Sequence, residues 1–255
     1  MNISKSTLPI FAGFVYLFLY TPIIVLVIYS FNQGGFPDAW KGFSFHWYFD
    51  LFHSEDIWRA FYNSVIVATV SSFFSVTMSV IFVHGMRYFN KNLVALFYSN
   101  ALIPDIVLAV GMMSLFSYLI IPLGLTTLIA GHTLLGFGFA MPIIKNRYDE
   151  LDKSLIEASY DLGASMRYTF FHVIVPFLYP SLLVAFLLSM IISFDDFLIS
   201  FFCSGSSVQT LSLYIFSMIR SGISPVVNAL STIMLVGSCT LLLVMMVFQK
   251  NLFKD

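Results

Sequence analysis

Three aspartates lie inside stretches of the sequence that are otherwise apolar. Asp105 follows Pro104 in the run 93–119, and the neighbours Asp195 and Asp196 lie in the run 177–202. An ionisable side chain near the middle of a bilayer costs about 2.5–3.5 kcal/mol on insertion scales, so such a residue is a functional candidate by default. Carboxylates in this setting can attract a cation or carry a proton or sodium ion. The sequence therefore predicts a cation pathway that uses these acids.

The two neighbouring acids constrain their surroundings. Adjacent carboxylates in an apolar segment repel each other, and one stays protonated unless a cation is present. On one continuous helix Asp195 and Asp196 would point about 100° apart, so they need not share a partner. Because such a pair is costly against lipid, at least one is expected to face a pore or a sister subunit.

Asp105 is expected beside a break in its span. Pro104 is tolerated at the first position of a helix and disrupts a helix interior, so the span is predicted to kink or restart there. Asp105 would then lie near the N-terminus of a half-helix, where the dipole favours a carboxylate, roughly 18 Å from the cytoplasmic end. The alternative is that Asp105 only satisfies backbone donors at the break.

A polar stretch, 157–176, interrupts the apolar C-terminal half. Just upstream, Ser154 and Glu157 fit a capping box that would begin a helix. Gly163 is placed to end that helix in a left-handed conformation, and Ser165 can cap a second short helix. Pro176 then precedes the next apolar run. The pattern predicts a rigid helix–turn–helix outside the bilayer, a shape suited to docking.

The composition places these segments in an integral membrane protein. Of the 255 residues, 59% are hydrophobic and 10% are charged, and the mean hydropathy is +0.90, more apolar than a soluble domain can bury. A net charge of -1 gives no basic footprint for nucleic acid. Two cysteines and five scattered histidines indicate neither a disulfide framework nor a metal site. The sequence contains no G-x-x-x-x-G-K-[ST], so any ATP that drives this protein must bind another chain.

Six runs are long enough to cross a bilayer, within one transmembrane domain that comprises residues 1–255. They are 8–31, 61–83, 93–119, 125–144, 177–202 and 226–248, with a loop at 145–176. Nine basic residues fall on one set of loops, namely Lys5, Arg87, Lys91, Lys145, Arg147, Lys153, Arg167, Lys250 and Lys254. Three fall on the other set, namely Lys41, Arg59 and Arg220. This asymmetry predicts that both termini and the loop 145–176 are cytoplasmic.

Three further segments have structural interpretations. Ser71, Ser75 and Ser79 recur every four residues and predict a small-residue face that lets another helix approach closely. The tryptophans of the first external segment, 32–60, fit either the membrane interface or a receptor-facing surface. Helical spacing of apolar residues predicts a short surface helix before Pro225.

The polar stretch resembles the EAA loop of ABC-importer permeases. The matching residues are Glu157-Ala158-Ser159, then Gly163, then Ile174-Val175-Pro176. The third EAA position is Ser159 here, and Val175 stands before the proline. Similarity to the spermidine/putrescine (polyamine) permeases of that group is strongest at Pro104–Ala109, Glu157–Ser165, Phe194–Phe197 and Ser217–Ala229, although Val226 stands where those permeases usually have an acid. The polyamine resemblance covers nearly the whole chain.

This resemblance implies an all-α fold with six transmembrane helices, the type I ABC-importer permease (MetI-like) fold, in a bacterial inner membrane. It implies four partners: a sister permease, a dimer of ATPase subunits that binds ATP and magnesium, a periplasmic binding protein, and a polyamine. The substrate pathway would use Asp105, Asp195 and Asp196. The residues implied in ATPase coupling are Glu157, Ala158, Asp161, Gly163 and Pro176. No catalytic residue is implied in this chain.

Other functions are compatible with parts of the sequence. The same fold could import ferric iron, another cation or an opine-like amine, whereas an anion would be repelled by the three acids. A secondary transporter or channel that uses Asp195 and Asp196 would need no ATPase, but it leaves the EAA-like stretch unexplained. A membrane-embedded enzyme is least favoured, because neither a Ser/His/Asp arrangement nor H-E-x-x-H is present.

Overall fold

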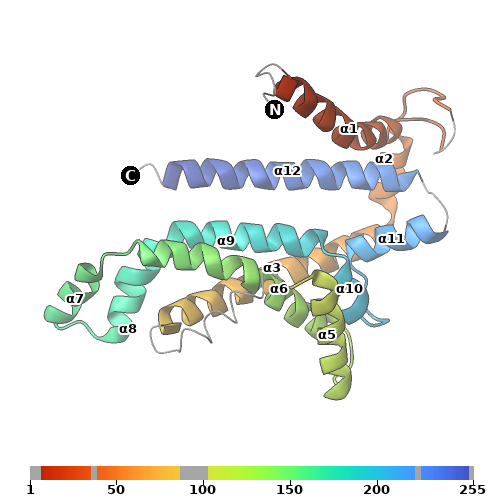
Figure 1. The fold of residues 1–255 in the computed structure, drawn as a ribbon. Helices are drawn as coiled ribbons and strands as arrows, with labels where there is room; N and C mark the ends of the chain where they lie inside the picture. The colour runs from red at the N-terminus through yellow and green to blue at the C-terminus, as the bar shows by residue number, and fades with distance from the viewer. Residues whose placement is uncertain (1–6, 36–38, 87–102, 222–224, 253–255) are drawn as a thin grey trace. The chain divides into compact units, whose positions relative to one another are not determined.

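The computed structural model describes residues 7–35, 39–86, 103–221 and 225–252, and the regular structure in these ranges is helical (Figure 1). The helices are α1 (Thr7–Tyr29), α2 (His46–His53), α3 (Glu55–Gly85), α5 (Asp105–Tyr118), α6 (Leu125–Asp149), α7 (Lys153–Asp161), α8 (Met166–Thr169), the π-helix η3 (Phe170–Ile174), α9 (Val175–Asp195), α10 (Leu198–Cys203), α11 (Leu211–Ser221) and α12 (Val226–Leu252). The all-α prediction is confirmed for this part of the chain.

Five segments within these helices are long and apolar enough to cross a bilayer. They are Phe11–Tyr29, Glu55–Gly85, Leu125–Asp149, Met166–Asp195 and Val226–Val244. Each overlaps one of the runs predicted from sequence. Of the remaining predicted span, 93–119, residues 93–102 lie outside the described ranges, and the described part forms α5, an apolar helix of 14 residues.

The chain divides into two units. Residues 1–58 and 215–239 form the first, and residues 59–214 and 240–255 form the second. In the first unit the segment after α1 is held to the end of that helix by polar contacts. The Ser30 hydroxyl lies 2.8 Å from the Tyr48 hydroxyl, and Trp47 donates its ring N–H to the Asn32 carbonyl at 2.8 Å.

The second unit is built around α6, which is the most buried of the long helices. Two glycines allow neighbouring helices to approach it closely. A Cβ on Gly131 would lie 2.6 Å from the Ile199 side chain of α10, and a Cβ on Gly136 would lie 2.6 Å from Ser75 Oγ of α3. The Ser75 hydroxyl donates across this contact to the Thr133 carbonyl at 2.8 Å. The small-residue face predicted from sequence therefore packs against α6.

Two apolar clusters fill the interior of this unit. Towards the α7 end of α6, Met141 and Ile144 pack with Val83 of α3 and with Ile174 and Leu178, at the junction of η3 and α9. Towards the start of α6, the cluster comprises Val67, Leu108, Ala109, Phe116, Leu128, Leu135, Ile199 and Cys203. Together these clusters fix α6 between α3, α5, α9 and α10.

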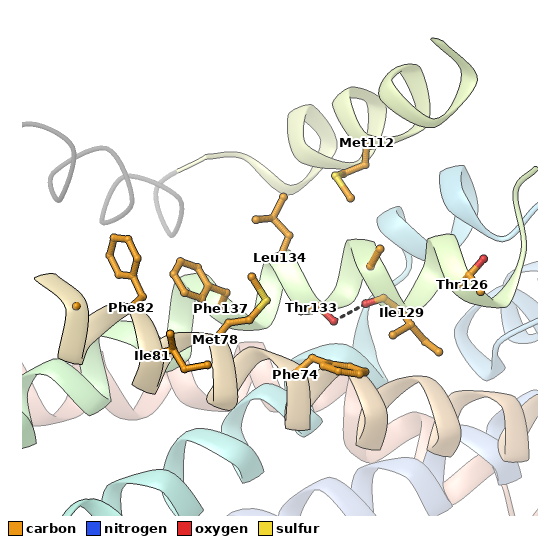
Figure 2. A pocket seen from close by; sticks show the side chains of 12 residues that line it. Phe74, Met78, Ile81, Phe82, Met112, Thr126, Ile129, Thr133, Leu134 and Phe137 are labelled. Carbon is orange, nitrogen blue, oxygen red and sulfur yellow. Dashed lines mark hydrogen bonds between the residues drawn. The ribbon is translucent and has the colours of Figure 1, made fainter. Parts of the chain in front are cut away.

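An apolar groove of about 950 Å³ lies where α3, α5 and α6 meet. Figure 2 shows Phe74, Met78 and Phe137 among the side chains that line it. The Thr133 hydroxyl at this wall is already used, because it donates to the Ile129 carbonyl at 2.6 Å. The groove thus offers almost only hydrocarbon surface.

Candidate transport site and coupling segment

The helix that carries the paired acids is broken at the pair. Helix α9 ends at Asp195, Asp196 has extended backbone angles (φ -66°, ψ 130°), and α10 begins at Leu198. The sequence analysis treated 177–202 as one helical span, and that expectation is wrong at this position. The physical reason is that the Asp196 carboxylate competes for the free amides that begin the next helix, as capping side chains do.

Asp196 is engaged by the protein itself. Its Oδ2 accepts a hydrogen bond from the Ser200 N–H at 3.1 Å, and the amides of Leu198 and Ile199 also donate to the carboxylate. Its carbonyl accepts from the Ser212 hydroxyl at 2.7 Å. Only 6% of the side chain is exposed. Asp196 therefore satisfies the first turn of α10, where a negative charge is favoured by the helix dipole.

A buried histidine lies beside Asp196. His132, on α6, places Nδ1 2.9 Å from Ser193 Oγ on α9 and Nε2 3.3 Å from Ser200 Oγ on α10. The same Nε2 lies 3.8 Å from Asp196 Oδ2. Ser193 Oγ in turn lies 3.4 Å from Ser71 Oγ of α3. The imidazole thus contacts both sides of the break.

The other two acids are more open. Asp195 ends α9 with an exposed side chain, and Asp105 is an exposed residue at the start of α5. Pro104 occupies the N-cap position of α5, so the predicted helix start at Pro104-Asp105 is confirmed. Asp105 lies close enough to Asp196 for their charges to repel. The fold therefore brings Asp105 into the electrostatic neighbourhood of the acidic pair.

The candidate coupling segment, residues 145–176, forms the helix–turn–helix predicted from sequence, with one correction. Helix α7 is capped by Asp152, whose Oδ1 accepts from the Ser154 N–H at 2.9 Å, and not by Ser154. The bonds from the Ser154 backbone and hydroxyl hold the pKa of the Asp152 carboxyl below its ordinary value. A carboxylate caps a helix at least as well as a hydroxyl and also suits the dipole, which explains the choice of residue.

The turn after α7 agrees with the sequence pattern. Gly163 adopts φ +83°, and its N–H donates to the Tyr160 carbonyl at 2.8 Å. Ser165 caps α8 by accepting from the Tyr168 N–H at 3.3 Å. Pro176 lies in the first turn of α9. The sequence analysis ran the loop to residue 176, whereas α8, η3 and α9 continue as one helical path from Met166 to Asp195.

The serine that departs from the EAA pattern has a structural partner. Ser159 Oγ lies 2.8 Å from Thr169 Oγ1, and Thr169 is fully buried. This bond joins α7 to α8 across the turn, a contact that alanine could not make. Glu157, Ala158 and Asp161 of α7 are exposed.

A hollow of about 800 Å³ opens between α7 and the turn that follows it. Its lining residues are Leu155, Ala158, Ser159, Leu162, Gly163, Ala164, Ser165, Tyr168 and Val173. Leu162 is 89% exposed, which is unusual for a leucine that is fixed in a helix end. An apolar hollow with an exposed leucine at its edge is typical of a docking surface.

Sequence reasoning missed His132 and its serine partners. It treated the histidine as one of five scattered residues, because its partners lie 61 to 68 positions away in the chain. The available signal was the position of His132 between Gly131 and Gly136 in an apolar run. Within the described residues, His, Cys, Asp and Glu side chains form no group of three or more that could hold a metal ion.

The chain was compared with known protein families and with known proteins. Residues 100–255 match the model of the family described as binding-protein-dependent transport system inner membrane component. The spermidine/putrescine transport system permease protein PotC of Haemophilus influenzae is 36% identical over 246 residues, which cover 93% of this chain and 94% of that protein. PotC of Escherichia coli K12 is 33% identical, with 94% and 91% covered. The putrescine permease PotI of the same strain is 31% identical, with 86% and 82% covered.

Solved structures agree on the fold. A chain of a bacterial ABC transporter that imports the acidic polysaccharide alginate superposes with a TM-score of 0.71 at 16% identity, covering 98% of this chain and 95% of that one. A chain of the MetNI methionine ABC transporter gives 0.57 at 19% identity, covering 78% and 95%. This is the MetI-like fold of ABC-importer permeases. The chain belongs to the family of inner membrane components of binding-protein-dependent transport systems.

Proposed function

We propose that this chain is one permease subunit of an ATP-driven polyamine importer and forms half of its translocation pathway. The observation that carries the proposal is the 36% identity to a spermidine/putrescine permease over 93% of the chain. The chain itself has a transport role and no catalytic one, since ATP is hydrolysed by a separate subunit in this class of transporter.

The cargo proposal also fits the chemistry of the acids. Spermidine and putrescine are flexible polycations that carboxylates and aromatic faces attract. Asp105 and Asp195 have exposed side chains that could meet such a cargo, and Asp196 would add its charge from the wall of the pathway. A pathway should release what it attracts, so contacts to a few separated charges suit it better than one tight site.

Coupling to the ATPase would run through α7 and the turn at Gly163. We place Glu157, Ala158, Asp161 and Gly163 at the docking surface, because they lie on the exposed side of α7 or border the apolar hollow. Pro176 lies in the first turn of α9, which leads from this surface towards the acids. The ATPase dimer would bind ATP and magnesium, and its closure on ATP would be transmitted along these helices.

The complete importer would contain four kinds of protein or ligand besides this chain. They are a sister permease, the ATPase dimer, a periplasmic binding protein and the polyamine. The excess of basic residues on one set of loops supports an orientation with both termini and α7 in the cytoplasm. Transport would proceed by alternating access. The periplasmic binding protein, loaded with polyamine, would dock on the outside as the receptor, and ATP hydrolysis would reset the inward-facing state.

Uptake of radiolabelled spermidine tests this proposal. The proteoliposomes contain this chain, the sister permease, the ATPase and the periplasmic binding protein. ATP-dependent accumulation that requires the receptor is expected, together with competition by unlabelled putrescine. If the complex instead accumulates ferric iron or another amine, the fold and coupling remain and the polyamine cargo is rejected. Uptake that proceeds without the ATPase would favour a secondary transporter.

A further inference from the structure

His132, on α6, contacts both α9 and α10 at their break. Its ring is buried, with 1% exposure, and each nitrogen has a partner within 3.3 Å. Neither the cation pathway nor the docking surface uses this group. A buried histidine that connects three helices must therefore be explained separately.

The direction of its hydrogen bonds can be assigned. Asp196 Oδ2 lies 3.8 Å from Nε2, beyond hydrogen-bond distance, but its negative charge favours the tautomer with the proton on Nε2, which then donates to the Ser200 hydroxyl at 3.3 Å. Nδ1 then accepts from the Ser193 hydroxyl at 2.9 Å. In this arrangement the neutral ring directs its Nε2–H towards Ser200 and Asp196. Its Nδ1 accepts a hydrogen bond from Ser193 of α9.

The helix that carries His132 also leads to the coupling segment. Helix α6 runs without interruption from Leu125 to Asp149, and only residues 150–152 separate it from α7. Near His132, Gly131 lets α6 approach Ile199 of α10 so closely that an added Cβ would lie 2.6 Å from it. A displacement of α6 would therefore shift α10 and the break between α9 and α10.

We propose that His132 is a positioning residue that fixes Asp196 and the first turn of α10 to α6, so that movement of the coupling segment reaches the acidic pair. The proposal rests on the proposed transport function. It divides the pair into two roles: Asp196 holds the break together, and Asp195 is left open to the cargo. His132 itself does not touch the transported molecule.

Two substitutions test the roles of the His132 ring nitrogens, Nε2 and Nδ1, separately. The amide of His132→Gln can reach as far as Nε2 and donate towards Ser200 and Asp196, whereas the amide of His132→Asn reaches only as far as Nδ1. In the reconstituted complex with its receptor and ATPase, we expect H132Q to keep most of the spermidine transported per ATP hydrolysed. H132N should lower that ratio roughly fivefold, as expected for the loss of a buried neutral hydrogen bond, here the one between Nε2 and the Ser200 hydroxyl that links α6 to α10. Equal ratios for the two variants would overturn the proposal.

The readout distinguishes positioning from a general loss of structure. A variant that merely folds poorly lowers uptake and ATP hydrolysis together and leaves their ratio unchanged. Thr133→Val is the matched control, because it removes a hydrogen bond within the same helix, from Thr133 to the Ile129 carbonyl, without touching the break. T133V is expected to keep the wild-type ratio.

A thermal-unfolding cycle on the purified full chain tests the contact without any cargo. His132→Leu, Asp196→Ala and the double variant are compared by their Tm. The proposal requires non-additivity: the Tm loss of the double variant should be smaller than the sum of the losses of the two single variants by more than the error of measurement. Additive losses would show that the two side chains act independently. Because this cycle needs no substrate, a complex that fails to transport spermidine would reject the polyamine proposal and leave this one standing.

Discussion

At the scale of single residues, the three acids of the apolar runs have unequal surroundings. Asp196 is 6% exposed and bonded to the Ser200 amide, whereas Asp105 and Asp195 are exposed. A carboxylate that is satisfied by backbone amides is less available to a cargo than one that is open. Equal charge in the sequence therefore does not imply an equal role.

This difference predicts the order of effects among substitutions. Asp105→Asn and Asp195→Asn should each lower spermidine uptake roughly tenfold at normal protein levels, because each removes an open charge from the pathway. Asp196→Asn should lower uptake less, because asparagine still accepts from the Ser200 amide as a cap. Asp196→Ala removes both charge and cap and should lower uptake and Tm together. Unchanged uptake in all three asparagine variants, with normal amounts of protein, would rule out the acid pathway.

The residue scale is also where sequence reasoning was least complete. Asp105 and the Asp195–Asp196 pair could be found because ionisable residues in apolar runs are conspicuous. The capping roles of Asp152 and Asp196 could not be separated from other uses of aspartate without backbone angles. The role of His132 was not recognised, because its partners become neighbours only after α6, α9 and α10 pack together.

At the scale of elements, the turn between α7 and α8 depends on one backbone conformation. Gly163 has φ +83°, and a Cβ there would meet no heavy atom within 4 Å, so a substitution is penalised by the backbone alone. Gly163→Ala should destabilise the turn by about 1–2 kcal/mol. Gly163→Asn should cost less, because asparagine adopts the left-handed conformation more readily. The receptor-stimulated ATPase rate is expected to fall in G163A more than in G163N; the reverse order would contradict this account of the turn.

The cap of α7 should depend on pH. Hydrogen bonds from Ser154 hold the pKa of Asp152 below its ordinary value of 3.8, so the folded state favours the charged carboxylate. The stabilisation is therefore present above about pH 3.8 and is lost as the pH falls through the lowered pKa. Amide hydrogen exchange in residues 153–161 should accelerate in that acidic range and in Asp152→Ala at neutral pH. An exchange rate in D152A equal to that of the wild type would show that the cap does not hold the helix.

Helix positions were largely predictable, and helix ends were not. Composition and span length located five membrane-crossing helices, because a bilayer imposes an apolar run of fixed minimum length. The break after Asp195 was missed, since 177–202 reads as one apolar run and no proline or glycine marks the interruption. The π-helical link through η3 was likewise absent from any local signal, and it replaced part of the expected loop with helix.

At the scale of the whole molecule, the proposed mechanism requires the docking surface and the acidic pair to respond to each other. Helix α6 leads from the break towards α7, and the path through α8, η3 and α9 leads from the docking surface to Asp195. These two routes are joined at the break by His132. The second unit is thus arranged to carry a displacement between its two ends.

The orientation of the chain gives a prediction at this scale. In a background where Cys203 and Cys239 are alanine, a cysteine at Asp161 should react with a membrane-impermeant maleimide only from the cytoplasmic side. A cysteine at Asp50 should react only from the outside. Both positions are exposed in the chain itself, and labelling is done without the ATPase, which the proposal places over Asp161. Labelling of both from one side would overturn the topology drawn from the basic residues.

The central claim is that this chain couples ATP hydrolysis in a partner to polyamine transport, and one measurement tests it most directly. The rate of ATP hydrolysis is measured for the permease reconstituted with its sister permease, ATPase and receptor, with and without spermidine. We predict stimulation that requires the loaded receptor and disappears when Gly163 is replaced by a bulky residue. Stimulation by another solute alone would reject the polyamine cargo, and failure of any ATPase to associate would contradict the account of the coupling segment.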